Sequence, residues 1–575
     1  MKSSSNALSR LWVLYAGIFL FSLILVARLF SIQVIHGDEY REKAERQYSV
    51  GGNGNFDRGS IFFTEKNGGQ IGAATLEAGY TIAINPKIMK DASEVFLKIS
   101  AIIPLERDTF FEKANKKDDP HEEIAKRLSE EKAIAIQKLG LTGVTIEKDK
   151  WRLYPGGRTA AHVLGFVGYK GDTLAGRYGL EAYYNDVLQK THENLYSNFF
   201  AEAFSLSRSF FEKNGWSEGD IVTSIEPSVE GFLENSLAGI MKKWNSELSG
   251  GIIMDPKTGE IYALANTPDF DPNTFGKEKS SSVFLNPIVE SLFEMGSIIK
   301  PLTMAAGLDA GVVLPATTYD DKGFVVVDNS TIRNFDGKGR GVVPMQEVLD
   351  ESLNTGAVYV MQKLGKDRFR DYMTRYGLGE ETGIDLPGEV RGSLKNLDEN
   401  AKNKRMVEYA TAAFGQGISM TPIETARALA VLANQGKMVT PYVVKEIKYA
   451  VGFSRTTVTD EAKPILKPET SETITRMLVH VVDNSLLGGT VKMKNYSIAA
   501  KTGTAQMARE DGKGYYDDRY LHTFFGYFPA YNPRFIVFLY TQYPKEVKYA
   551  AYTLTEPFMN IAKFLINYYN IPPDR

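Results

Sequence analysis

The chain has 575 residues, a formal net charge of −3, and a composition that is 43% hydrophobic and 24% charged, which is typical of packed globular domains rather than of disordered chains. This length predicts two or three domains, and the small net charge gives no reason to expect nucleic acid as a partner. The absence of cysteine excludes disulfides, thiolate metal sites and cysteine nucleophiles. The six histidines form no clustered ligand pattern, so we expect neither a metal nor another cofactor.

An apolar segment near the N-terminus predicts a membrane anchor. Leu11 to Val26 contains no charged residue, and the apolar pattern continues beyond it, which makes the whole segment long enough to span a bilayer. A cleaved signal peptide is the alternative, but Leu25-Val26-Ala27 is a poor cleavage site. We therefore expect a transmembrane helix over residues 11–34. By the positive-inside rule, residues 1–10 form a cytoplasmic tail and the rest of the chain lies outside.

Residues 35–235 predict an elongated, non-catalytic α/β domain, which we call the pedestal. Tyr80–Ile84 and Val144–Ile146 have the composition of strands. Ser93–Ile103 and Pro120–Lys138 have the pattern of helices. No set of residues in the pedestal predicts catalysis.

Residues 236–575 predict a second domain, in which strands enclose helices. A β-hairpin is expected near its start, then a long and mainly helical stretch to about residue 490, then three strands and an amphipathic helix. These elements are the hairpin strands Gly251–Asp255 and Glu260–Ala265, the later strands Tyr496–Thr502, His522–Phe528 and Phe535–Tyr543, and the helix Met559–Asn570. Strands at both ends of one domain predict a single antiparallel sheet with a helical insertion. The expected fold class is therefore α+β, with a cleft between sheet and insertion as the natural place for a site.

The segment Phe293–Met304 predicts a loop that runs into a helix beginning at Ser297. Gly296 permits the turn, and Pro301 is tolerated in a first helical turn, where amides lack partners. Lys300 lies three residues after Ser297 and shares its helix face. A hydroxyl beside an amine at a helix N-terminus suits a serine nucleophile, because the amine can take the proton and the N–H groups favour an oxyanion.

A Ser-x-x-Lys match alone is weak evidence, and its weight depends on motifs further along the chain. Ser129–Lys132 matches as well, but it lies in a charged amphipathic helix pattern. Two further elements lie downstream of Ser297: Ser352-Leu353-Asn354, where a turn enters a helix, and Lys501-Thr502-Gly503-Thr504, at the end of a strand. The decoys Ser4-Ser5-Asn6 and Lys257-Thr258-Gly259 show that a tripeptide alone proves little. Order and context therefore carry the hypothesis.

These three elements in this order are the signature of penicillin-binding proteins and serine β-lactamases. Over nearly its whole length the chain resembles a class B penicillin-binding protein, and the supporting matches are Arg58-Gly59-Ser60-Ile61, Tyr154-Pro155, Ala161–Phe166, Gly179-Leu180-Glu181, Phe414–Ile418 and Lys501–Gln506. Two features depart from the family's pattern. Met295 stands where proline is usual, and Lys66-Asn67-Gly68 only loosely represents the Asp-Arg-Asn-Gly that often follows the first match. Neither departure removes a catalytic group.

The resemblance implies a division of roles among the motif residues. Ser297 would be the acylated nucleophile, and Lys300 would be deprotonated in a desolvated site and act as its general base. Ser352 would relay a proton to the leaving amine, and Asn354 would hold the substrate amide. Lys501, a second cation in the same cleft, would lower the pKa of Lys300 by like-charge repulsion.

The strand motif is similar to the family's carboxylate-binding site. Lys501, with the hydroxyls of Thr502 and Thr504 on either side of Gly503, would bind the terminal carboxylate of a D-Ala-D-Ala stem peptide. The oxyanion hole would be formed by the backbone N–H groups of Ser297 and Thr504.

The resemblance also implies a function and a place in the cell. We expect a transpeptidase that cross-links peptidoglycan stem peptides and is inhibited covalently by β-lactams. It would be a single-pass protein of the bacterial cytoplasmic membrane, with its catalytic domain outside and a membrane-embedded glycosyltransferase as its partner. Length and pedestal motifs favour the division or sporulation branch over the elongation branch, which stays open.

Other interpretations use the same residues. A carboxypeptidase or β-lactamase could use the same site, but the anchor and the pedestal favour a transpeptidase. A penicillin-sensing receptor needs a signalling domain for which the short tail leaves no room, and the intact motifs speak against an inert scaffold. His522 invites a Ser-His-Asp interpretation, yet the three motifs explain Ser297 without it and no nucleophile-elbow pattern appears. His162 is interpreted as a packed core residue.

Overall fold

The structure is a computed structural model that describes residues 56–171, 173–190, 218–398, 405–450, 452–458, 461–509 and 514–575, with two isolated positions at 19 and 21. Apart from those two positions, the expected tail (1–10) and anchor (11–34) lie outside the described residues. Within the described ranges, no helix is both long enough and apolar enough to cross a membrane.

The described chain divides into two compact units. The smaller unit contains Glu77–Trp151, and the larger unit contains Asp57–Leu76 together with Arg152–Arg575. The expected boundary between residues 235 and 236 stays a prediction, and in the structure it falls inside helix α11 (Pro227–Trp244).

The smaller unit packs helices against a short sheet. The later part of β2 (Gln70–Ile84) pairs with β3 (Glu122–Leu128) and β4 (Val144–Leu153), and the helices are α3 (Ala92–Ser100), α4 (Arg107–Ala114) and α5 (Glu130–Gln137). The core contains Ile82, Ile84, Val95, Ile99 and Phe110. The strand expected at Tyr80–Ile84 and the helix expected at Ser93–Ile103 are thus confirmed in kind, with shifted ends.

The helix expected over Pro120–Lys138 is wrong in its first half. Glu122–Leu128 is strand β3, whose Ala125 pairs with Ile82 of β2. Glutamate, alanine, lysine and leucine favour helices, but pairing with an open strand edge overrides so weak a preference. Ser129, from the decoy Ser-x-x-Lys, is the N-cap of α5.

Part of the larger unit is a small sheet in the order β16-β15-β7-β1, followed by the first part of β2. Its strands are β1 (Ile61–Thr64), β7 (Gly219–Thr223), β15 (Val444–Tyr449) and β16 (Ser454–Thr456). Nearby lie the short hairpin of β5 (Val167–Lys170) and β6 (Thr173–Gly176) and the short helices α6 (Ala161–Leu164), α7 (Gly179–Tyr183) and α8 (Asn185–Leu188).

A buried ionic cluster joins three of the family-like segments in this region. The carboxylate of Glu181, which is fully buried, binds the guanidinium groups of Arg58 (Oε2 to Nε 2.5 Å) and Arg152 (Oε1 to Nε 2.6 Å). The hydroxyl of Tyr154 donates to the same carboxylate at 3.2 Å. Burial raises the pKa of Glu181, but Arg152 and Arg58 outweigh it and leave the pKa below its ordinary value.

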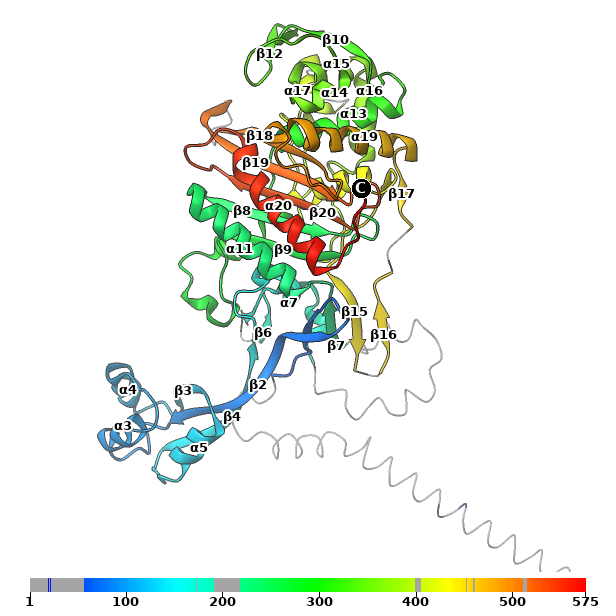
Figure 1. The fold of residues 1–575 in the computed structure, drawn as a ribbon. Helices are drawn as coiled ribbons and strands as arrows, with labels where there is room; N and C mark the ends of the chain where they lie inside the picture. Colours follow the sequence, from blue (N-terminus) through cyan, green and yellow to red (C-terminus); the bar gives the residue numbers. More distant parts are fainter. Residues whose placement is uncertain are drawn as a thin grey trace, which may run out of the picture. The chain divides into compact units, whose positions relative to one another are not determined.

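The centre of the larger unit is a five-stranded antiparallel sheet in the order β18-β19-β20-β8-β9 (Figure 1). Its strands are β8 (Leu248–Met254), β9 (Ile261–Thr267), β18 (Ala499–Ala508), β19 (Tyr515–Phe528) and β20 (Phe535–Gln542). The first and last parts of the domain therefore complete one sheet, as the sequence predicts. Strands β18 and β19 are longer than expected.

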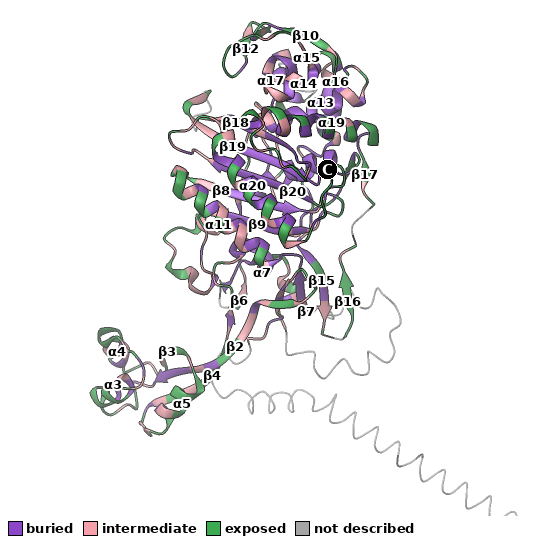
Figure 2. Ribbon diagram, viewed as in Figure 1, coloured by how far each residue is buried: buried purple, intermediate pink, exposed green. Residues whose placement is uncertain are grey.

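Both faces of this sheet are covered, and its strands are buried (Figure 2). Phe535, Val537 and Leu539 share one core cluster with α11 and α20 (Ala550–Tyr568), whereas Ile536 and Phe538 belong to the cluster of the helical region. Alternate residues of a strand point to opposite faces, so β20 supplies both cores at once.

The helical region lies on the other face of the sheet. Its principal helices are α13 (Lys300–Asp309), α14 (Met345–Asp350), α15 (Asn354–Leu364), α16 (Lys366–Arg375), α17 (Met406–Ala412), α18 (Pro422–Ala433) and α19 (Pro468–His480). The expectation of a mainly helical insertion is confirmed, but two parts of it form strands. Residues 437–464 contain β15, β16 and the short pair β14 (Lys437–Met438) with β17 (Lys463–Pro464). Residues 318–344 form two strand pairs, β10 (Thr318–Asp321) with β13 (Gly341–Pro344) and β11 (Phe324–Val327) with β12 (Ser330–Arg333).

The strand pair of β11 and β12 has a local cause. Asp328 and Asn329 both have positive φ values, +49° and +66°, between β11 and β12. Two central residues with positive φ make the turn that a tight hairpin favours, and asparagine and aspartate tolerate it better than most residues.

Candidate active site

Ser297 and Lys300 lie where a tight turn becomes a helix. Ser297 belongs to the 3-10 turn η5 (Gly296–Ile299), and Lys300 begins α13 with Pro301 directly after it. The expected helix therefore begins three residues later than Ser297, although the turn leads into it without a break. Ser297 is half-buried, while Lys300 is only 1% exposed.

Backbone contacts fasten this turn to the central sheet. Gly296 has φ +66°, its N–H donates to the carbonyl of Gly415 at 3.0 Å, and a Cβ there would lie 3.0 Å from the carbonyl oxygen of Thr504. The hydroxyl of Thr523 on β19 donates to the carbonyl of Met295 at 2.9 Å. A side chain at position 296 would thus be both strained and crowded.

Ser352 lies in the turn between α14 and α15 and meets both lysines. The Lys300 amine donates to the carbonyl oxygen of Ser352 at 2.5 Å and to its Oγ at 3.1 Å. The Lys501 amine donates to the same Oγ at 3.1 Å and to the carbonyl of Thr502 at 3.1 Å. The structure therefore brings together one residue from each of the three sequence motifs, since the lysines of two motifs both bind the Ser352 hydroxyl of the third.

The surroundings of both amines lower their pKa values. Burial lowers the pKa of Lys300 well below its ordinary value of 10.5, and the charge of Lys501 lowers it further. Burial also lowers the pKa of Lys501 to about 8, against the opposing effect of Asp350. An amine with a pKa near 8 stays largely protonated at neutral pH, whereas the environment of Lys300 favours the neutral form.

Asn354 is the first residue of α15, on the same turn as Ser352. Its Nδ2 donates to the carbonyl of Arg333 at 2.9 Å. A carbonyl can only accept, so this bond fixes which way the amide faces. Its Oδ1 accepts no hydrogen bond from any residue that the structure describes.

The strand motif lies in the middle of β18. Lys501 and Gly503 are buried, whereas Thr502 and Thr504 are partly exposed. A Cβ at Gly503 would lie 2.3 Å from Oγ1 of Thr523, so only glycine fits beside β19. The Oγ1 of Thr504 accepts from the backbone N–H of Ala550 at 3.1 Å, which ties the strand to the start of α20.

His522 and His162, the two histidines considered in the sequence analysis, have structural roles. His522 is fully buried, and its ring nitrogens lie 2.9 Å from Oγ1 of Thr553 and 3.0 Å from the carbonyl of Lys548. Both ring nitrogens are thereby engaged, by α20 and by the segment just before it, so neither is free to act as a base for Ser297. Burial lowers the pKa of His522 to about 4. His162 is buried with its Nε2 at 3.0 Å from the carbonyl of Val283.

Sequence reasoning missed Asp350, which ends α14 two residues before Ser352. Its carboxylate lies 3.0 Å from Nδ1 of His480 and is the negative charge that acts on Lys501. An acidic residue so close to the Ser-x-Asn motif was the only signal for it in the sequence.

Comparison with known proteins agrees with this geometry. Residues 250–563 match the model of the penicillin binding protein transpeptidase domain, and residues 57–196 match that of the penicillin-binding protein dimerisation domain. Stage V sporulation protein D of Bacillus subtilis (strain 168) is 31% identical over 544 residues, which cover 93% of this chain and 81% of that protein. Peptidoglycan D,D-transpeptidase MrdA of Acinetobacter baumannii is 31% identical over 443 residues, 70% of this chain and 64% of that protein.

Solved structures show the same fold. Penicillin binding protein 3 of Mycobacterium tuberculosis, complexed with aztreonam, matches with a TM-score of 0.68 at 23% identity. The match covers 91% of this chain and 98% of the solved chain. Penicillin Binding Protein 2X of Streptococcus thermophilus has a TM-score of 0.72 at 19% identity and covers 90% of this chain and 81% of that one. With the transpeptidase model spanning more than half of the sequence, the chain belongs to the penicillin-binding protein transpeptidases, as a class B penicillin-binding protein.

Proposed function

We propose that this protein is a peptidoglycan D,D-transpeptidase that cross-links stem peptides ending in D-Ala-D-Ala through an acyl-enzyme on Ser297. One observation carries the assignment of residues: the Oγ of Ser352 lies 3.1 Å from the amines of both Lys300 and Lys501, beside the turn that holds Ser297. A buried amine whose pKa is well below its ordinary value, a second buried amine with a pKa of about 8 and a connecting hydroxyl suit serine acylation.

Acylation begins with Lys300. Its neutral amine takes the proton from Oγ of Ser297 as that oxygen attacks the carbonyl carbon of the penultimate D-alanine. The backbone N–H groups of Ser297 and Thr504 stabilise the negative charge that develops on the carbonyl oxygen. The C–N bond to the terminal D-alanine then breaks, and a proton passes from Lys300 through Oγ of Ser352 to the leaving amine.

Deacylation repeats these steps in reverse with a new amine. The amine of a neighbouring stem peptide attacks the ester carbonyl, loses its proton through the same groups and releases Ser297. A new amide bond joins the two stems. Attack by water on the same ester would give a carboxypeptidase, so access of the acceptor amine decides between the two activities.

The substrate is bound by residues of strand β18 and by Asn354. Protonated Lys501, with the hydroxyls of Thr502 and Thr504 on either side of Gly503, binds the terminal carboxylate. The Oδ1 of Asn354 accepts an N–H of the bound peptide. β-Lactams carry a carboxylate and an acylating carbonyl, so they occupy the same groups and leave a covalent adduct on Ser297.

We also propose the cellular setting. The apolar segment at residues 11–34 would anchor the protein in the bacterial cytoplasmic membrane, with its catalytic domain outside and a membrane-embedded glycosyltransferase beside it. We favour septal wall synthesis in division or sporulation, supported by the relative named stage V sporulation protein D; the relative named MrdA keeps the elongation branch as the alternative. A fluorescent fusion tests this, because it should collect at septa rather than along the side wall.

Labelling with fluorescent penicillin tests the activity. The adduct should map to Ser297, and Ser297→Ala should abolish labelling while leaving thermal unfolding nearly unchanged. Labelling elsewhere, or undiminished labelling of the variant, would sink the assignment. Incubation with a stem peptide and an acceptor amine then separates the alternatives, since a transpeptidase yields the cross-linked amide and a carboxypeptidase yields the free acid.

Fractionation tests the anchor. The full-length protein should stay with the membrane after a carbonate wash, and a version starting near Gly37 should be soluble. A mature N-terminus near residue 28 would instead show that the segment is a signal peptide.

A further inference from the structure

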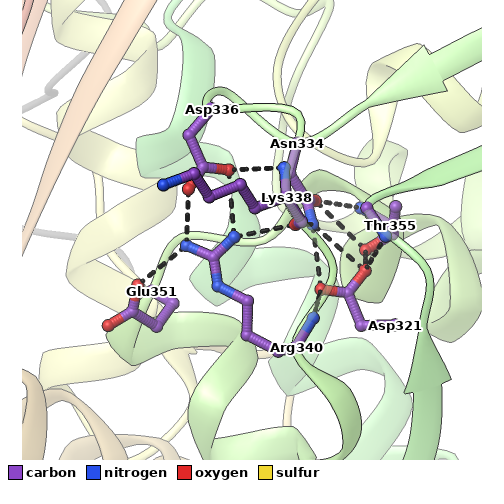
Figure 3. Close-up of polar contacts among 8 residues, drawn as sticks. Asp321, Asn334, Asp336, Lys338, Arg340, Glu351 and Thr355 are labelled. Atoms are coloured by element: carbon purple, nitrogen blue, oxygen red, sulfur yellow. Dashed lines mark hydrogen bonds and ion pairs between the residues drawn. The ribbon is translucent and has the colours of Figure 1, made fainter.

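The strand-paired segment at residues 318–344 contacts the turn that carries Ser352 through a buried polar network (Figure 3). Asp321, at the end of β10, and Asn334, just after β12, are 1% and 4% exposed. The Oδ1 of Asp321 accepts from the hydroxyl of Thr355 at 2.8 Å, and its Oδ2 accepts from the backbone N–H of Arg340 at 3.0 Å. The Nδ2 of Asn334 donates to both carboxylate oxygens, at 3.1 Å and 3.0 Å.

Asn334 supplies a helix cap from a distant part of the chain. Its Oδ1 accepts from the backbone N–H of Thr355 at 3.2 Å and lies 3.1 Å from the Thr355 hydroxyl, whose single proton goes to the carboxylate of Asp321. Thr355 is the second residue of α15, and the residue at the N-cap position is Leu353, whose side chain cannot accept a hydrogen bond. Asp321 can only accept from Asn334, so it fixes the orientation in which the amide oxygen of Asn334 faces the helix.

Further bonds from the same segment reach the other residues of this turn. The carbonyl of Arg333 binds Nδ2 of Asn354 at 2.9 Å. The guanidinium of Arg340 binds Glu351 at 3.1 Å, directly before Ser352. Between these contacts Ser352 has φ +53°, a left-handed conformation that is unfavourable for a residue other than glycine. The turn therefore needs outside contacts to hold the shape that presents Oγ of Ser352 to both lysines.

We propose that Asp321 and Asn334 are positioning residues for the reaction, which hold Ser352 and Asn354 in register with Lys300 and Lys501. This inference rests on the proposed function. Asp321 and Asn334 touch neither the nucleophile nor the two lysines, and they act through the geometry of the turn. Their loss would let the turn relax and move Oγ of Ser352 away from the proton path, whereas the carboxylate site on β18 would stay in place.

The first test is Asn334→Ala, with the acylation rate constant and the dissociation constant of the pre-covalent penicillin complex measured separately. Loss of the cap and of a donor to Asp321 should lower the rate constant about 10- to 100-fold, because small displacements of reacting groups have effects of that size. The dissociation constant should change by a smaller factor than the rate constant, because Lys501 and the β18 site are untouched and only the contact of Asn354 with the ligand is weakened. A loss confined to the dissociation constant would contradict the proposal.

An exchange of the two side chains gives a rescue. Asn334→Asp alone places two carboxylates face to face and should acylate slowly, although it keeps an acceptor for the Thr355 N–H. The double variant Asp321→Asn with Asn334→Asp again opposes one amide and one carboxylate, but the new amide also faces the backbone N–H groups of Gly323 and Arg340, which donate to Asp321 in the wild type. It should therefore recover only part of the acylation rate that Asn334→Asp loses. Equal rates in the single and double variants would overturn the pairing argument.

Thr421→Ala provides a matched control. Thr421 is a fully buried N-cap of α18, and its hydroxyl accepts from the N–H of Glu424 at 3.1 Å. Its removal should lower thermal stability comparably and leave the acylation rate constant unchanged. If Thr421→Ala slows acylation as much as Asn334→Ala does, the effect is general loosening and the positioning role is wrong.

Two outcomes separate this inference from the proposed function. Wild type without an adduct on Ser297 would contradict the function itself. Wild type acylated at Ser297, together with a folded Asn334→Ala that acylates equally fast, would contradict only the positioning role. If Asn334→Ala does not fold, the milder Thr355→Val decides, since it removes one donor to Asp321 and should slow acylation about 3- to 10-fold.

Discussion

Two buried groups of charges in the larger unit are built in opposite ways. Around Glu181, one carboxylate meets the guanidinium groups of Arg58 and Arg152. Around Ser352, two amines meet a hydroxyl and two carbonyls, and neither Lys300 nor Lys501 forms an ion pair with a described residue.

The comparison shows what compensation does to a buried charge. The paired carboxylate keeps its charge, and its pKa falls despite burial. The pKa of the unpaired Lys300 amine is lowered well below its ordinary value, because burial and a second cation both oppose the charged form. Compensated charge joins segments of the fold, whereas uncompensated charge favours the neutral amine that the proposed base at Lys300 requires.

The largest effect is expected from Lys300→Arg, which restores a permanent charge at the position that needs a neutral amine. Arginine cannot accept the proton of Ser297, so acylation should fall about 10²- to 10⁴-fold, the usual contribution of a general base. The measurement is the acylation rate with small β-lactams. Near-normal acylation by this variant would show that Lys300 is not the base.

Glu181→Gln should affect stability instead. It leaves two buried guanidinium groups without their carboxylate, which should lower the free energy of unfolding by about 3–5 kcal/mol. Denaturant unfolding measures the loss, and the acylation rate of the folded fraction serves as the control. A stable variant would mean that Arg58 and Arg152 find other partners.

A third prediction concerns Lys501, which is needed for its charge. Lys501→Ala should weaken reaction with carboxylated β-lactams by about 10- to 150-fold, which corresponds to the loss of one charge-assisted hydrogen bond of about 1.5–3 kcal/mol. Lys501→Arg keeps the charge and should retain measurable acylation. Removing this cation should also raise the pKa of Lys300. Equal acylation rates of Lys300→Arg and Lys501→Arg would show that the two lysines do not have the separate roles of base and carboxylate-binding cation.

The smallest effect is expected in the acylation rate at alkaline pH. The pKa of Lys501 is lowered to about 8, so its positive charge is present below pH 8 and is lost as the pH rises through that value. Acylation by a carboxylated β-lactam should therefore fall about 10-fold between pH 7 and pH 9. An esterified β-lactam lacks the carboxylate and should not show this fall. A shared decline would place the titration elsewhere.

Much of the site can be predicted from the sequence because its motifs are local. A serine three residues before a lysine at the start of a helix predicts their shared position, and the order of the motifs predicts that Ser352 and Lys501 join them. The strands at both ends of the domain predict one sheet, since apolar runs such as Phe535–Gln542 have no other place to be buried.

The rest depends on contacts between distant segments. Asn334 caps a helix that begins twenty residues later, and nothing in the sequence around Asn334 distinguishes it from a loop asparagine. Strand β3 exists because β2 offers it an edge. Asp350 matters through its field at Lys501, which appears only when α14 and β18 are placed together.

The close packing of the Ser297 turn against the sheet has a consequence for drug resistance. Positions 296 and 503 have no room for a side chain, since a Cβ at either would meet the backbone or side chain of the neighbouring strands. The turn of Ser297 and strand β18 are therefore packed so closely that these two positions should tolerate no larger residue. Substitutions that exclude an antibiotic yet spare the natural peptide are then expected in the segments around them, such as residues 318–344, which contact the turn of Ser352.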